Sequence, residues 1–261
     1  MSMEIICKNG RSPVLFQYLL EIADDHLILG HRLSQWCGHG PTLEEDIALS
    51  NLALDCIGAA KLIYETIETG SQRTADELAF FRTENEFRNC LLAEQENGHF
   101  GVTITRQLFL DIYYDLLFSS LAKAIDLTLS ALATKFGKEV IYHLRHSSSW
   151  FIRLGDGTSE SRAKIQESVD LLWPFVSELF FVSPALKQLN DSYGVPLFDS
   201  DKLKLAWQER LYSICNLATV TCPEFPQLPL NSGRVGRHSE CLGHLLAEMQ
   251  STARAFPGVK W

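Results

Sequence analysis

Apolar residues recur at helical spacing along almost the whole chain, and alternating, strand-like patterns are nearly absent. Residues 14–36 carry the first such pattern, and the sequence GHGP at 38–41 stops it. Thr42 and Glu45 then form a T-x-x-E capping box. This box predicts the start of a second helix that runs to about Thr69.

The middle of the chain predicts one short and two long helices. A second capping box at 74–77 opens a shorter helical stretch that reaches about Glu94. From Phe100 to about Leu154 the apolar spacing scarcely pauses, and we expect two long helices with a break near Gly137.

Further helices follow the long ones. One begins near Ser159 and meets Pro174, which must either kink it or start a new helix. Residues 200–219 and 239–255 predict the last two helices. The sequence therefore predicts an all-α fold with four long core helices and additional C-terminal helices.

We expect one domain over residues 1–261, since this length lies within reach of a single core. Residues 1–13 form an N-terminal extension that we expect to be loosely ordered. Residues 156–261 are expected to form a helical appendage packed on the bundle.

The second long helix has an unusual pattern, because its segment 47–63 is apolar on nearly every side. Such a helix is normally surrounded by others, so we expect it at the bundle centre. Asn51 and Asp55 lie four residues apart and share one face. They predict an interhelical polar pair that fixes register; the alternative is a functional polar pocket.

Composition and charge narrow the function classes. The chain has 23 basic and 32 acidic residues, a net charge of −9, which argues against nucleic acid or an anionic membrane as the main partner. The sequence shows no signal peptide and no apolar run long enough for a membrane span. Its seven cysteines form no C-x-x-C pair, which favours a reduced, cytoplasmic location.

A candidate metal site lies in the segment EVIYHLRHS, where Glu139, His143 and His146 recur at helical spacing. Helical bundles that bind paired iron take one Glu from each of two helices and a Glu-x-x-His unit from each of the other two. Val140 occupies the position three before His143, so this unit lacks its carboxylate. Because the six-ligand set cannot be assembled, a hydrogen-bonded polar cluster or an ion pair is favoured over a metal site.

A basic loop forms a second candidate. Arg234 and Arg237 lie beside glycines and a predicted helix N-terminus, an arrangement that can hold a phosphate group. The favoured interpretation is a surface loop with ordinary charges.

Four long segments carry a resemblance to a known family. They are LGHRLSQWCGHGPTLEEDIALSNLALDCIG, EQENGHFGVTITRQ, YHLRHSSSWFIRLGDGT and HLLAEMQSTARAFPGVKW. In this order they resemble the C subunits of the bacterial ring 1,2-phenylacetyl-CoA epoxidases, over the chain from about residue 20 to the C-terminus.

The resemblance implies a ferritin-like helical bundle that binds no metal and needs no cofactor of its own. It implies a non-catalytic role in phenylacetate catabolism, as the structural partner of a catalytic A subunit that holds di-iron and epoxidises phenylacetyl-CoA with O₂. Other subunits and an NADPH-dependent reductase complete that monooxygenase complex.

Set against the catalytic subunit, the vacated ligand positions fall on Cys56, Ala59 and Val140. The remnant polar pocket is then expected to contain Asn51, Asp55, Glu139, His143 and His146, while Arg234 and Arg237 are candidate contacts for the phosphates of coenzyme A. Two alternatives remain open: a divergent metal-binding oxygenase or oxidase active on its own, and a helical interaction protein unrelated to oxygen chemistry.

Overall fold

The computed structural model describes residues 13–228 and 231–259, and within these ranges the regular secondary structure is entirely helical. The all-α prediction is therefore confirmed. The described residues form two compact units, which are interleaved along the sequence. Within the described ranges, the first unit takes residues 13–96, 183–192 and 231–259, and the second takes residues 97–182 and 193–228.

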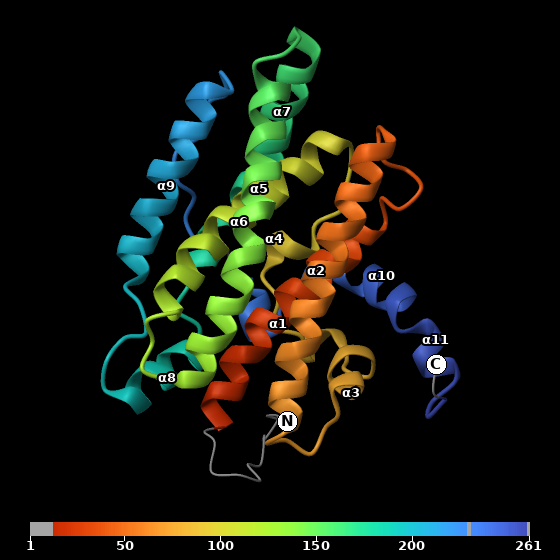
Figure 1. Cartoon of the computed structure of the whole chain (residues 1–261), viewed down its shortest axis with the longest axis vertical. Coiled ribbons are helices and arrows are strands. Elements are labelled where there is room, and N and C mark those ends of the chain that lie inside the picture. The colour runs from red at the N-terminus through yellow and green to blue at the C-terminus, as the bar shows by residue number, and fades with distance from the viewer. Residues whose placement is uncertain (1–12, 229–230, 260–261) are drawn as a thin grey trace. The chain divides into compact units, whose positions relative to one another are not determined.

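The first unit is built on two long helices that lie side by side (Figure 1), α1 (Pro13–Ser34) and α2 (Leu43–Glu68). Thr42 caps α2 by accepting a hydrogen bond from the Glu45 backbone N–H at 3.3 Å, as its capping motif predicts. The helices are antiparallel and approach closely at Gly30, where an added Cβ atom would lie 2.8 Å from Ile57.

Shorter elements complete the first unit. They are α3 (Ala75–Phe80), the 3₁₀ helices η1 (Glu84–Glu86) and η3 (Gly233–Val235), α4 (Leu91–Glu94), most of α8 (Pro184–Tyr193), α10 (Glu240–Met249) and α11 (Ser251–Ala255).

Two adjacent carboxylates of α1 organise this unit. Asp24 is fully buried and accepts hydrogen bonds from the Tyr64 hydroxyl and from Arg82, whose Nη1 lies 2.9 Å from Oδ2. Asp25 forms a salt bridge with Arg234, whose Nη2 donates a hydrogen bond to Asp25 Oδ2 at 2.7 Å. A buried charge must be paired and hydrogen-bonded to be tolerated, so these contacts fix α1 against α2 and two distant segments.

The second unit contains α5 (Phe100–Leu121), α6 (Leu127–Gly155), α7 (Ser159–Leu172), the 3₁₀ helix η2 (Trp173–Phe180) and α9 (Ser200–Leu217). Helices α5 and α6 form a second antiparallel pair, in which the Phe118 and Phe136 rings lie 6.2 Å apart. Trp207 of α9 is buried against this pair and donates a hydrogen bond from Nε1 to the Phe109 carbonyl at 2.9 Å. Its ring also meets the Phe109 ring edge to face.

The prediction of four long helices before residue 156 is confirmed, but the break expected near Gly137 is wrong. The break lies at residues 122–126, where the Asp126 carboxylate caps α6 by accepting from the Thr128 and Leu129 backbone N–H groups at 2.9 Å. Helix α6 runs through Gly137 without a break. The backbone φ of Gly137 is ordinary for a helix, and an added Cβ atom would meet Phe118 at no less than 3.8 Å, so the position does not require glycine. Pro174 starts a new helix, η2, at its first turn.

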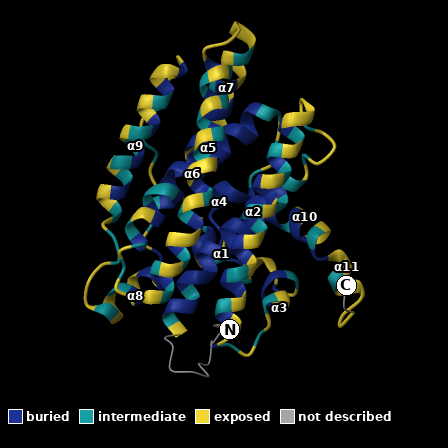
Figure 2. Cartoon of the chain, viewed as in Figure 1, coloured by how far each residue is buried: buried dark blue, intermediate teal, exposed yellow. Residues whose placement is uncertain are grey.

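The central position predicted for α2 is also wrong. One face of α2 packs on α1, but Leu43, Ile47 and Leu54 are 73%, 54% and 67% exposed. Exposed and buried positions therefore alternate along α2 (Figure 2). The pattern predicted a helix surrounded on nearly every side, but the chain itself covers α2 on one side.

Two stretches are long and apolar enough to cross a bilayer by length and composition alone, Leu43–Glu68 and Ser159–Tyr193. Of the 18-residue apolar window in each stretch, 44% and 50% is buried inside the protein. Core helices of globular proteins satisfy the same criterion of length and composition.

The prediction of one domain stays a prediction. The expected appendage 156–261 is divided between the units, since α7, η2 and α9 belong to the second and α10 and α11 to the first. The predicted N-terminal extension lies outside the described residues, apart from Pro13 at the start of α1.

Candidate functional site

A buried polar cluster joins α5 and α6 in the second unit, and we call Gln107, Asp111, His143 and Ser147 the α5–α6 cluster. The Gln107 amide donates to Asp111 Oδ1 at 2.7 Å. The Ser147 hydroxyl donates to Asp111 Oδ2 at 2.6 Å. All four residues are at most 4% exposed, so Asp111 is a desolvated carboxylate held by neutral donors.

Helical spacing places these residues together. Gln107 and Asp111 are one turn apart on α5, and His143 and Ser147 are one turn apart on α6. Burial raises the pKa of Asp111 to about 6, which the nearby His143 charge and the two hydrogen bonds partly oppose. Asp111 is therefore a weaker acid than an ordinary aspartate.

The α5–α6 cluster does not fit a paired-iron centre. Both carboxylate oxygens of Asp111 already accept hydrogen bonds from Gln107 and Ser147, whose amide nitrogen and hydroxyl donate rather than bridge a metal. Val140, one turn before His143, is buried and apolar. Among the described residues, no three His, Cys, Asp or Glu side chains converge on a point that could hold a metal ion.

The vacated positions on α2 lie in a tightly packed region. Cys56 and Ala59 are buried, at 2% and 3% exposure. Opposite them, a Cβ added to Gly30 would lie 3.2 Å from the Cys56 Cβ and 3.1 Å from the Ala53 carbonyl oxygen. Small side chains allow this close approach of α1 and α2, and carboxylates of the size needed for metal ligation would force the helices apart.

The other predicted pocket residues are less buried than expected. Asn51 is exposed on α2, and Asp55 is half-buried. Glu139 and His146 are half-buried on α6, whereas His143 is buried. Asn51 and Asp55 belong to the first unit and the α6 residues to the second, so a single remnant pocket that includes both groups stays a prediction.

Of the α5–α6 cluster, the predicted pocket contained His143 alone, and it missed Gln107, Asp111 and Ser147. Gln107 and Ser147 lie one turn from Asp111 and His143, and this i, i+4 spacing was the signal that could have found them. Asp111 is visible in the sequence as an acid in an apolar helix. Which residues of α6 meet Asp111 depends on the register of α5 against α6, because Ser147 reaches it from the other helix.

The two candidate phosphate-binding arginines differ in their surroundings. Arg234 is 7% exposed, and its guanidinium is bonded to Asp25 and to the backbone carbonyls of Glu21 and Arg88 at 3.1 and 2.9 Å. It is therefore engaged inside its own chain, which argues against a contact with coenzyme A. Arg237 is exposed, and its contact with a phosphate stays a prediction.

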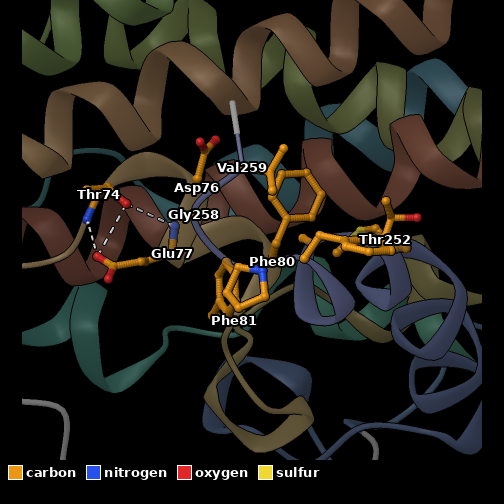
Figure 3. Close-up of a pocket in the computed structure, with 12 residues that line it drawn as sticks. Thr74, Asp76, Glu77, Phe80, Phe81, Thr252, Gly258 and Val259 are labelled. Atoms are coloured by element: carbon orange, nitrogen blue, oxygen red, sulfur yellow. Dashed lines mark hydrogen bonds between the residues drawn. The ribbon is translucent and has the colours of Figure 1, made fainter. Parts of the chain in front are cut away.

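An open groove lies in the first unit between α3 and the C-terminal helices (Figure 3). Its volume is about 720 Å³, and Phe80, Phe81, Phe256 and Val259 supply much of its apolar lining. At its edge Glu77 accepts a hydrogen bond from the Thr74 backbone at 2.8 Å, so this carboxylate is committed to capping α3. The apolar lining of the groove suits an apolar group, with Thr74, Asp76, Glu77 and Thr252 as its polar lining residues.

The helix order places the chain in a structural class. Two antiparallel pairs of long helices, separated by the long connection 69–99, are the arrangement of ferritin-like proteins. The chain is an all-α protein of this ferritin-like class.

Comparison with known proteins identifies the family to which this chain belongs. The chain belongs to the family of phenylacetic acid catabolic proteins, whose model matches residues 6–261. It is similar to the C subunit of the 1,2-phenylacetyl-CoA epoxidase of Escherichia coli (strain K12), with 40% identity over 248 residues. The alignment covers 95% of this chain and 99% of that relative. The family resemblance seen in the sequence is thus confirmed.

Proposed function

We propose that this chain is the structural, non-catalytic subunit of a multicomponent phenylacetyl-CoA 1,2-epoxidase. In this proposal it pairs with a di-iron catalytic subunit in the cytoplasm and supports the helices that hold the iron. Further subunits and a reductase complete the complex. The identity with the bacterial C subunit, over nearly the full length of both chains, supports membership of such a complex.

The α5–α6 cluster is the observation that supports a non-catalytic role. Asp111 and His143 are the two buried residues of ligand type in this cluster, and the Asp111 oxygens are occupied by hydrogen-bond donors. A paired-iron centre needs six inward ligands. The cluster is therefore suited to fixing the register of α5 against α6.

The exposed face of α2 supports pairing with another subunit. Leu43, Ile47, Asn51, Leu54 and Gly58 follow one another at intervals of three or four residues and form one exposed stripe, which we call the α2 stripe. A partner helix laid along this stripe would bury the side of α2 that the chain leaves open. The apolar pattern that predicted a surrounded helix is then satisfied in the complex.

The test is metal analysis of the chain purified alone and after co-expression with the di-iron catalytic subunit proposed above. We expect the lone chain to contain no stoichiometric metal, and iron to appear in a co-eluting complex. Stoichiometric iron in the lone chain would contradict the non-catalytic role. Failure of the two chains to co-elute would contradict pairing and favour an unrelated helical interaction protein.

The turnover of a variant distinguishes a structural role of this chain from a catalytic one. In the isolated complex, Asp111→Asn should change the turnover of phenylacetyl-CoA by less than about threefold, because the residue does not touch the reacting atoms. A catalytic acid or base at this position would cost about 10²-fold or more. The measurement is made on complex that has co-eluted, so that a loss of folding is not mistaken for a loss of chemistry.

A further inference from the structure

Two cysteines that belong to no C-x-x-C motif meet at the end of α9. The Sγ atoms of Cys215 and Cys222 lie 3.0 Å apart, while both residues are free thiols. A disulfide bond needs a separation of about 2.05 Å, so the sulfur atoms must move by about 1 Å to bond. Neither thiol takes part in the function proposed above.

The turn after α9 brings the cysteines together. The backbone N–H of Val220 bonds to the Cys215 carbonyl at 3.0 Å, and that of Thr219 bonds to the Asn216 carbonyl at 3.3 Å. This pair of bonds is a Schellman motif, in which the residue at the left-handed position is usually glycine. Here Thr219 takes that position, with φ +54°. The turn sends the chain back along the last turn of α9, so that Cys222 returns to Cys215.

Contacts from three other segments hold this strained turn. The Thr219 hydroxyl donates to the Gly155 carbonyl at 3.2 Å. Gln166 brackets Thr221 from both sides, accepting from its N–H at 2.9 Å and donating to its carbonyl at 2.8 Å. Trp173 Nε1 donates to the Glu224 carbonyl at 2.7 Å. Cys222 thus lies between two anchored residues, and its place beside Cys215 is built by the surrounding fold.

We propose that Cys215 and Cys222 form a reversible disulfide when the protein meets a peroxide. In a reducing compartment the pair rests as two thiols, and oxidation joins the end of α9 to the loop that follows it.

The two thiols differ in their surroundings, which sets the order of events. Cys215 is 2% exposed, whereas Cys222 is half-buried and is the sulfur that an oxidant reaches. The hydrogen bond with Cys222, together with burial, raises the pKa of Cys215 well above that of an ordinary thiol. Cys215 therefore stays protonated until its partner has reacted.

The chemistry balances in two steps. Hydrogen peroxide oxidises the Cys222 thiol to a sulfenic acid, and its O–O bond breaks to release one water. The Cys215 sulfur then attacks the Cys222 sulfur, the S–O bond breaks, and the hydroxyl leaves as a second water with the Cys215 proton. A dithiol reductant restores both thiols and is itself oxidised to a disulfide.

The experiment uses the full-length chain, treated with limited hydrogen peroxide, alkylated in denaturant and digested with trypsin. The sequence between Arg210 and Arg234 has no lysine or arginine, so both cysteines fall in one peptide. We expect its mass to fall by about 2 Da through loss of two hydrogens, with neither cysteine alkylated and full reversal by dithiothreitol. We also expect the midpoint of thermal unfolding to rise by roughly 5 °C, because the cross-link constrains the unfolded chain.

Variants make the result specific. Cys215→Ser should leave the Cys222 sulfenic acid to be trapped by dimedone and should abolish the thermal shift. Gln166→Ala keeps both thiols but loosens the loop, so the disulfide should form several-fold more slowly. Cys37→Ser, at an exposed cysteine, is the matched control and should change nothing.

Two outcomes would overturn the proposal. One is a peptide that keeps both alkylatable thiols after peroxide treatment. The other is a peptide that gains two oxygen atoms at Cys222 while Cys215 remains alkylatable, which is over-oxidation of a cysteine without a resolving partner.

Discussion

Glu21 on α1 is a buried acid whose pKa is shifted by its surroundings. It is 5% exposed, and Arg234 Nε lies 3.9 Å from its carboxylate, beyond hydrogen-bonding distance. Burial raises its pKa from 4.5 to about 7, against the opposing effects of Arg234, Ser183 and Arg88. Asp25 adds to the rise, because its nearby negative charge disfavours the ionised form of Glu21.

We predict that the free energy of unfolding of the original protein falls between pH 4.5 and pH 7 because of Glu21, and that Glu21→Gln abolishes this part of the fall. In this window the unfolded chain releases the Glu21 proton while the folded chain retains it, so the free energy of unfolding falls as pH rises. The contribution of Glu21 to that fall is on the order of 3 kcal/mol. Denaturant titrations of both proteins at pH 4.5 and 7.5 measure it, and equal pH dependence in the two would contradict the pKa assigned to Glu21.

Residue identity predicted part of this chemistry. The segment 139–146 predicted a polar cluster of Glu139, His143 and His146, which did not include Asp111, whose pKa the charge of His143 lowers. The sequence did not indicate that Arg234 would be buried against Asp25, because these residues are more than two hundred positions apart. Pairing between residues so far apart in the sequence depends on how the elements assemble, and the spacing of residues within one element does not predict it.

At the scale of the element, α2 contains a glycine that its own chain does not explain. Gly58 is exposed in the α2 stripe, and an added Cβ atom would meet nothing within 4 Å. Glycine inside a helix costs about 0.5–1 kcal/mol relative to alanine. A partner helix that approaches closely at this point would account for it, since small residues let backbones come near.

We predict that Gly58→Ala raises the free energy of unfolding of the lone chain by about 0.5–1 kcal/mol. Gly58→Leu should leave the lone chain folded but weaken its association with the catalytic subunit by about tenfold or more, because the larger side chain holds the partner away. Chemical denaturation and quantitative gel filtration measure the two effects.

Glu209→Leu places the same side chain at an exposed position of α9 and is the matched control. It should leave association unchanged. Normal pairing of Gly58→Leu would show that the partner does not cover the α2 stripe.

At the scale of the whole molecule, the described residues form two compact units. The Asp24–Arg82 pair lies wholly within the first, with both side chains fully buried. The Arg82 guanidinium also lies 4.1 Å from the centre of the Phe87 ring. Loss of the cation would leave the Asp24 carboxylate without its neutralising partner, which is far costlier than loss of an exposed ion pair.

We predict that Arg82→Met lowers the free energy of unfolding by about 3–5 kcal/mol. Arg210→Met, which removes a partly exposed bridge to Asp115 in the second unit, should cost less than about 1 kcal/mol. In Arg82→Met, amide hydrogen exchange should accelerate in α1 and α2 while α5 and α6 keep most of their protection. Equal loss of protection in all four helices would mean that the two units unfold as one.

The sequence by itself determined the helical class, the presence of four long helices and the capping residues that open α2 and α3, because apolar spacing and capping residues act within one or two turns. It also indicated the family, through long segments that match in order. The tertiary structure decided which apolar face of α2 the chain covers, which acids receive Arg82 and Arg234, and that Cys215 meets Cys222. These contacts join helices, loops and turns whose approach is set by packing, and packing follows from the whole core and not from local spacing.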